Sequence, residues 1–164
     1  MAPQRTTPGP DQESVWDYPR PPRLEPVSAS IRVVFNGTTI AETDRALRIL
    51  ETSHPPTYYI PPEDVATEFL TREDRSTHCE WKGRSQYYTV TVGDRTAPHA
   101  AWNYPSPNEQ YAALKDHFAF YASKMDACYV GDEEAHAQKG DFYGGWITSD
   151  IVGPFKGGPG SIGW

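Results

Sequence analysis

Apolar and polar positions alternate along much of the chain, and this alternation is typical of half-buried β-strands. The clearest case is residues 30–43, where β-branched residues flank Asn36-Gly37, the strongest two-residue signal for a β-hairpin. With a tight turn at Asn36-Gly37, Phe35 pairs with Thr38 and Val33 with Ile40. One face of this hairpin is then apolar, and we expect it to cover a core.

A second hairpin is expected over residues 77–92, with its turn at Gly83-Arg84. This register sets Cys79 opposite Tyr88 and Trp81 opposite Gln86. Cys79, Trp81 and Tyr88 then share the core-facing side of the hairpin, and Lys82 faces the other way.

Shorter apolar runs between prolines and glycines predict further strands over residues 45–51, 57–60, 100–104, 117–121 and 125–130. Pro62 followed by two acidic residues resembles the first turn of a helix. Residues 108–116 carry an Asn cap and good helix formers, so they predict a short helix. The fold class that follows is mainly β: a compact antiparallel fold, curved or with two sheets, and with one or two short helices.

The chain divides into three parts by composition. Residues 1–14 are polar and lack apolar periodicity, which predicts a disordered arm. Residues 15–136 form a single β-rich domain that includes an extended N-terminal segment. Residues 137–164 are rich in glycine, yet we expect an ordered extension packed on the domain, because large apolar side chains need burial. These side chains are Phe142, Tyr143, Trp146, Ile147, Phe155 and Trp164.

The amino-acid composition limits the classes of partner that we expect for this protein. The 164 residues include 5 Trp, 10 Tyr and 6 Phe, which predicts an aromatic core, and a formal charge of −7 argues against a nucleic-acid partner. No apolar run is long enough to span a membrane and no secretory signal is visible, so a cytoplasmic location is expected. The two cysteines and five scattered histidines lack metal-ligand spacing, so the sequence predicts free thiols, no metal and no cofactor.

Several stretches of the chain occur together in one known family. They are VWDYPRPP, ETSHPPTYYIPPEDV, THCEWKG, AWNYPSPN, FAFY and FYGGWITSDIVGPFKG. On these stretches the chain resembles the domain of unknown function 427 family, from about Asp17 to the end. The family is small and β-rich, so the resemblance implies a fold and little about activity.

The same family has also been labelled nucleotidyltransferase. That chemistry needs a Gly-Ser loop before a helix and paired carboxylates for two metal ions, and neither is found in this sequence. The family's fold has been likened to tent-shaped β domains that hold ligands in aromatic cages and are often braced by a four-cysteine zinc. With two cysteines, this chain shares with such domains the shape and not the metal.

The aromatic residues suggest a binding site for a small organic ligand. Many Tyr and Trp beside proline-stiffened loops suit a cleft that holds a flat or cationic molecule, although packing of the core explains much of the set. The predicted ligand contacts are Trp81, Trp102, Tyr58, Tyr88, Tyr104 and Lys82, with Glu51 as a further charge at the rim.

Two other functions stay open. In one, the protein is an enzyme on a small molecule, with Cys79, Lys82 or the carboxylate of Glu51 as catalytic groups; the strand geometry favours an inert thiol instead. Glu51, His54, Asp64 and Lys82 form a polar cluster if the first sheet edge meets the second hairpin, although a plain salt bridge beside a turn explains them as well. In the other, the protein is a homodimer assembled through its aromatic termini.

Overall fold

The computed structural model describes residues 4–79, 81–139, 144–157, 161 and 164. Among the described residues, strands make up 48% and helical turns 13%, so the prediction of a mainly β fold with antiparallel sheets is confirmed. Within the described ranges no helix is long and apolar enough to cross a membrane.

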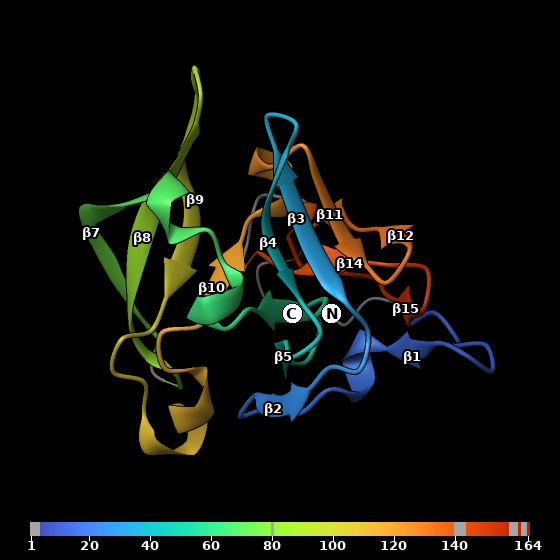
Figure 1. Cartoon of the computed structure of the whole chain (residues 1–164). Coiled ribbons are helices and arrows are strands. Elements are labelled where there is room, and N and C mark those ends of the chain that lie inside the picture. The colour runs from blue at the N-terminus through green and yellow to red at the C-terminus, as the bar shows by residue number, and fades with distance from the viewer. Residues whose placement is uncertain (1–3, 80, 140–143, 158–160, 162–163) are drawn as a thin grey trace.

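Two four-stranded antiparallel sheets face each other across the main core (Figure 1). The first has the order β10 (Phe118–Phe120), β9 (Arg95–Asn103), β8 (Gly83–Val92) and β7 (Leu70–Cys79). The second has the order β12 (Glu133–Glu134), β11 (Ala127–Val130), β3 (Ile31–Phe35) and β4 (Thr38–Thr43).

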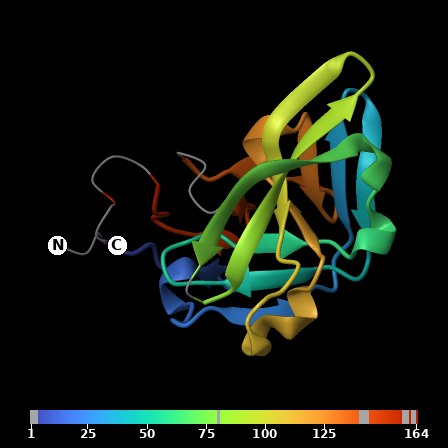
Figure 2. The ribbon, with the colours of Figure 1, turned by 90° about the vertical axis from the view of Figure 1, so that its left-hand side faces the viewer.

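A third sheet extends the first one. Its order is β2 (Arg23–Pro26), β5 (Leu47–Leu50) and β6 (Thr57–Tyr59). Just after β6, Ile60 and Phe118 exchange two backbone hydrogen bonds of 2.8 Å, which join β6 to β10. The chain therefore builds one curved surface from β2 to β7, and in Figure 2 the strands of the third sheet run across the lower end of the long green and yellow strands.

Shorter pieces complete the fold. Two two-stranded sheets pair β13 (His136–Ala137) with β14 (Trp146–Ile147), and β1 (Glu13–Ser14) with β15 (Ile151–Val152). Helical turns of the 3-10 type that lie wholly within the described residues are η1 (Val15–Asp17), η2 (Pro62–Asp64), η3 (Thr67–Phe69), η4 (Glu109–Leu114) and η5 (Ala122–Lys124). The boundaries of arm, domain and extension stay predictions. Phe142 and Tyr143 lie outside the described residues.

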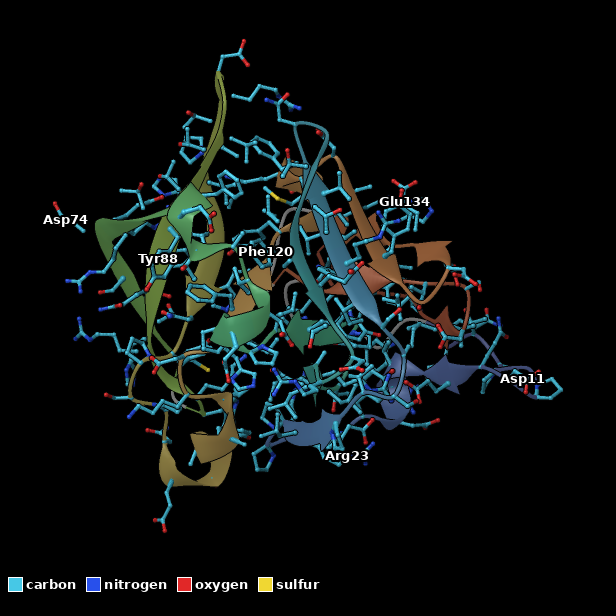
Figure 3. The ribbon with its side chains drawn as sticks, in the orientation of Figure 1. Asp11, Arg23, Asp74, Tyr88, Phe120 and Glu134 are labelled. Carbon is cyan, nitrogen blue, oxygen red and sulfur yellow. The ribbon has the colours of Figure 1, made fainter. Side chains whose placement is uncertain are left out.

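The joined strands β6, β10 and β9 separate two aromatic cores, because successive side chains of a strand point to opposite faces. Tyr58 and Ile60 belong to the first core, between the two four-stranded sheets, and Tyr59 belongs to the second. Figure 3 shows Tyr88 and Phe120 in the interior between these sheets and Asp74 at the outer edge of β7. The second core consists of Ile49, Tyr59, Trp102, Tyr104, Tyr111, Leu114 and Ala119.

The hairpin at Asn36-Gly37 forms as predicted, but its register holds only near the turn. Phe35 faces Thr38, whereas Val33 faces Ala41 and not Ile40, because a bulge shifts the register between Val33 and Val34. The bulge buries both Ile40 and Ala41. A two-residue periodicity cannot anticipate the one extra residue that a bulge inserts.

The predicted register of the second hairpin is wrong. Cys79 pairs with Gly83 and Thr77 with Ser85, so the turn lies between Cys79 and Gly83 and not at Gly83-Arg84. The strand β7 also begins earlier than expected, at Leu70, and all ten of its residues are exposed or half-buried. An exposed edge strand carries little apolar alternation, and this is why the sequence pattern missed it.

The two predicted helices are also shorter than expected. Pro62 opens one 3-10 turn, and residues 108–116 form the 3-10 segment η4 with a kink at Tyr111. The Asn108 side chain forms no cap hydrogen bond to this segment. Its amide instead donates to the Trp81 backbone oxygen at 2.8 Å, so η4 braces the turn that leads to Lys82.

Candidate functional site

Lys82 lies in the turn between β7 and β8 and is only 6% exposed. Its backbone oxygen accepts a hydrogen bond of 3.0 Å from the backbone of Asn108. Its ammonium nitrogen lies 5.8 Å from the centroid of the Tyr104 ring, within the range of a cation–π interaction. Burial of an ammonium group costs free energy. An apolar side chain at this buried position would avoid that cost, so packing alone does not explain a lysine here.

Glu51 and His54 lie in the loop between β5 and β6, near Lys82. The Glu51 carboxylate has an Arg20 nitrogen at 3.9 Å and His54 Nε2 at 3.7 Å. Burial raises the pKa of Glu51, and the positive charges of Lys82, Arg20 and Lys156 oppose that rise. Glu51 therefore interacts with several cations at once.

Gln138 fixes the tautomer of His54. The backbone N–H of Gly145 donates to Gln138 Oε1 at 3.1 Å, which sets the orientation of the amide. Gln138 Nε2 then donates to His54 Nδ1 at 3.1 Å and to the Lys156 backbone oxygen at 2.8 Å. Because Nδ1 accepts, the proton of a neutral imidazole is on Nε2, the atom that faces Glu51.

Burial keeps His54 uncharged. Burial, together with the positive charges of Lys156, Arg20 and Lys82, lowers the pKa of His54 to about 3. A protonated imidazole would also lose the hydrogen bond from Gln138, because Nδ1 would become a donor. The geometry and the electrostatics thus agree on a neutral His54.

Tyr59 provides the most unusual polar atom of the site. Its side chain is fully buried in the second core, and its hydroxyl has no hydrogen-bond partner of ordinary geometry among the described residues. Burial raises the pKa of Tyr59, whereas Lys82 and the polar groups of Trp102 and Tyr104 lower it. The hydroxyl therefore lies near an ammonium group and two polar aromatic rings without a good bond to any of them.

Aromatic rings and glycines enclose this polar group. Trp102 is 5% exposed and its ring centroid lies 6.3 Å from that of Tyr59 and 4.6 Å from that of Tyr121. Gly144, at φ +65°, packs so closely that a Cβ there would lie 2.4 Å from the Trp102 ring. The C-terminal segment is thus in direct contact with the second core.

The structure separates the predicted ligand contacts into two groups. Trp81, Trp102, Tyr104 and Lys82 lie in or against the second core. Tyr58 and Tyr88 lie in or against the first core, where their rings pack on Trp146 at 5.2 Å and on Phe118 at 5.1 Å. The two groups are on opposite sides of the surface formed by β6, β10 and β9.

Of the predicted polar cluster, the structure brings Glu51, His54 and Lys82 together. Asp64 lies elsewhere, where it accepts hydrogen bonds from Thr43 at 2.6 Å and Arg45 at 3.1 Å.

Both cysteines are free thiols; Cys128 is buried and Cys79 is half-buried. Cys79 ends β7 and Lys82 follows in the turn to β8, so the two residues flank the same turn.

Sequence reasoning missed Gln138 and the special position of Tyr59. Gln138 had no local signal, because its partners come from distant segments. Tyr59 had no local signal either, because the burial of the run from Ser53 to Pro61 depends on packing against distant segments.

The described residues contain no group of three His, Cys, Asp or Glu side chains placed to hold a metal ion. The molecule is thus defined as a small β domain with a buried lysine and a half-buried glutamate beside an aromatic core. The sequence profile described as domain of unknown function DUF427 matches residues 23–131, and the chain belongs to that family. No curated protein matches the chain.

Proposed function

We propose that the protein is a binding module for a small organic ligand, held by Trp81, Trp102, Tyr104 and Lys82. One observation carries the proposal: the ammonium group of Lys82 is buried beside Tyr104 and near Glu51, at the margin of an aromatic core. Flat apolar walls with a few placed polar groups are the usual composition of a small-molecule site.

The position of the turn supports entry from the surface. Trp81 precedes Lys82 in the turn and is half-buried, as are Cys79 and Tyr87. Trp102 and Tyr104 are buried beneath them. A ligand at the turn would therefore contact Trp81 first and reach Lys82 below it.

Tryptophan fluorescence during a screen of metabolites tests the proposal. The variant Trp81→Phe should lose the ligand-induced change, because it removes the ring at the entrance. Trp16→Phe is the matched control, since Trp16 is also half-buried but packs in a separate apolar cluster. If every compound that perturbs the wild type perturbs Trp81→Phe equally, Trp81 is no part of a site and the proposal fails.

Catalysis at the same site is the second candidate function, with Lys82, Glu51 and Cys79 as reacting groups. It is favoured by the position of Cys79 at the end of β7, in the same turn as Lys82. Fast alkylation of Cys79 in the native protein, compared with Cys128 as the buried control, would support it. Slow labelling of Cys79 that speeds up only on unfolding would contradict a nucleophilic thiol.

A homodimer assembled through the aromatic termini stays a prediction. Within one chain the rings of Trp16 and Trp164 lie 5.7 Å apart, so these two rings already contact each other.

A further inference from the structure

Two β-bulges meet in the first four-stranded sheet, away from Lys82. The register between β7 and β8 shifts after Arg72, and the register between β8 and β9 shifts after Tyr88. As a result, residues 73–75 of β7 and residues 98–100 of β9 leave the regular ladders on the two sides of β8. Bulges redirect side chains and are over-represented next to active sites.

His99, in the bulge of β9, has a left-handed backbone with φ +53°. Among the described residues other than glycine, a positive φ occurs at Asn36, Ser53, His99 and Asp116, and of these only His99 lies inside a strand. This conformation is unfavourable for a residue with a Cβ atom, and it persists where the surroundings impose it. Contacts of His99 with its neighbours must therefore hold it in place.

The Glu73 carboxylate, in the bulge of β7, supplies these contacts. Its Oε2 accepts hydrogen bonds of 2.8 Å from the backbone N–H of His99 and of 2.7 Å from the Thr89 hydroxyl. Its Oε1 contacts Nδ1 of the His99 ring. Burial raises the pKa of Glu73, but the hydrogen bonds from Thr89 and His99 outweigh burial and hold the pKa below its ordinary value. The carboxylate is thus ionised at neutral pH.

The contact with Glu73 decides which nitrogen of the His99 ring is reactive. An ionised carboxylate only accepts hydrogen bonds, so Nδ1 donates, and a neutral imidazole then carries its lone pair on Nε2. Nδ1 is buried although the His99 side chain is 42% exposed, so the exposed edge of the ring is the one away from Glu73. Nε2 has no hydrogen-bond partner among the described residues.

We infer that His99 Nε2 is a nucleophile toward activated esters and that Glu73 is its positioning residue. A carboxylate that holds an imidazole in one tautomer, and stabilises the positive charge that develops on the ring, is the arrangement that activates histidine in acyl transfer. This site is separate from the proposed ligand site and does not depend on it.

The reaction has two steps. The Nε2 lone pair attacks the ester carbonyl carbon, and the bond from this carbon to the leaving oxygen breaks, so the leaving group departs as an anion. The acylated ring is positively charged because Nδ1 keeps its proton, and the Glu73 carboxylate stabilises that charge. Water then attacks the acyl carbon, and the electrons of the C–N bond return to Nε2. A carboxylic acid and one proton are released, and that proton balances the charge of the leaving group.

A neutral acyl group suits this site better than a phosphoryl group. A phosphate monoester carries about two negative charges, and the ionised Glu73 beside the ring repels them. Hydrolysis of p-nitrophenyl acetate by the full chain, followed by release of p-nitrophenolate, is therefore the first assay, and p-nitrophenyl phosphate is the comparison.

Two variants assign the reaction to residues. His99→Gln and Glu73→Gln should each lower the rate constant for p-nitrophenyl acetate at least about tenfold. The amide of Glu73→Gln donates to Nδ1, so the ring proton moves to Nε2 and the reactive lone pair is lost. His78→Gln is the matched control and should react like the wild type, because His78 is exposed in β7 and has no carboxylate partner among the described residues. Cys79→Ala should also keep the rate.

Labelling with diethyl pyrocarbonate, which acylates imidazole nitrogens, gives a second readout. Mass spectrometry of peptides reports the labelling rate of each histidine. In the wild type His99 should react faster than His78, although His78 is the more exposed residue, and in Glu73→Gln the order should reverse. A carboxylate that only braces the bulges would leave the order to exposure. If the urea midpoint shows that Glu73→Gln is unfolded, the order in the wild type decides alone.

Three results would overturn the inference. The first is ester hydrolysis that survives His99→Gln, and the second is labelling of wild-type His99 no faster than that of His78. The third is a rate that is lost in Cys79→Ala, because it assigns the reaction to the thiol. Faster release of p-nitrophenolate from the phosphate than from the acetate would overturn the choice of an acyl substrate.

Discussion

His54 makes the stability of the fold depend on pH in a way that one substitution can isolate. The imidazole is buried, accepts a hydrogen bond from Gln138 at Nδ1, and has its pKa lowered to about 3. In the unfolded chain its pKa is about 6.5. Below that pH the unfolded state binds a proton that the folded state excludes, so stability is full above pH 6.5 and is lost progressively as the pH falls toward 3.

The magnitude follows from the two pKa values. Each pH unit below 6.5 removes about 1.4 kcal/mol, so the wild type should lose about 2 kcal/mol from this group between pH 7 and pH 5. Glu51 acts in the opposite direction, since its raised pKa makes the folded state bind protons more readily as the pH falls. The wild type alone therefore reports the sum of several groups.

The assay is urea unfolding at pH 7, 6 and 5 for the wild type, His54→Gln and the exposed-site control His136→Gln. His54→Gln retains Glu51, so the difference between its pH slope and that of the wild type isolates the imidazole. We expect the variant to lose about 2 kcal/mol less than the wild type over this range. Identical slopes for the wild type and His54→Gln would show that His54 is protonated in the fold and would refute the assignment of its tautomer.

Three further predictions concern packing. Trp102→Ala should lower the free energy of unfolding in urea by about 3–5 kcal/mol, as for a core tryptophan. Trp81→Ala should lower it much less, because Trp81 is half-buried. Equal losses would contradict the distinction between core and entrance. Gly144→Ala should destabilise by about 1–3 kcal/mol because its Cβ would overlap the Trp102 ring, and an unchanged midpoint would show that the segment can move away. Trypsin should cut at Lys156, whose backbone N–H is hydrogen-bonded to the domain, more slowly than at Arg5; equal rates would indicate a loose C-terminal segment.

Local signals predicted the strands and the position of the first hairpin, because Asn36-Gly37 specifies a turn through its own backbone preferences. They failed where contacts with residues distant in sequence determine the local structure. The second hairpin turns before Gly83, where a Cβ would lie 3.2 Å from the Ser106 oxygen and where Asn108 binds the Trp81 oxygen. Neither contact is visible in the hairpin's own sequence.

Predictions about the candidate site were limited in the same way by contacts between distant segments. Sequence reasoning could predict the grouping of Glu51, His54 and Lys82, because charged residues beside turns often form ion pairs. The same reasoning placed Asp64 in the cluster and was wrong there. The Asp64 carboxylate accepts hydrogen bonds from Thr43 and Arg45 instead. The orientation of Tyr58 and Tyr59 toward different cores depends on how β6 joins β10, a long-range pairing that no local pattern encodes.

The most direct test of the ligand site is a crystal structure of the protein soaked with a compound that perturbs its tryptophan fluorescence. We predict that this compound lies against Trp81 or Trp102, with a polar atom within hydrogen-bond distance of Lys82 Nζ. A compound bound only away from these residues would contradict the proposed function.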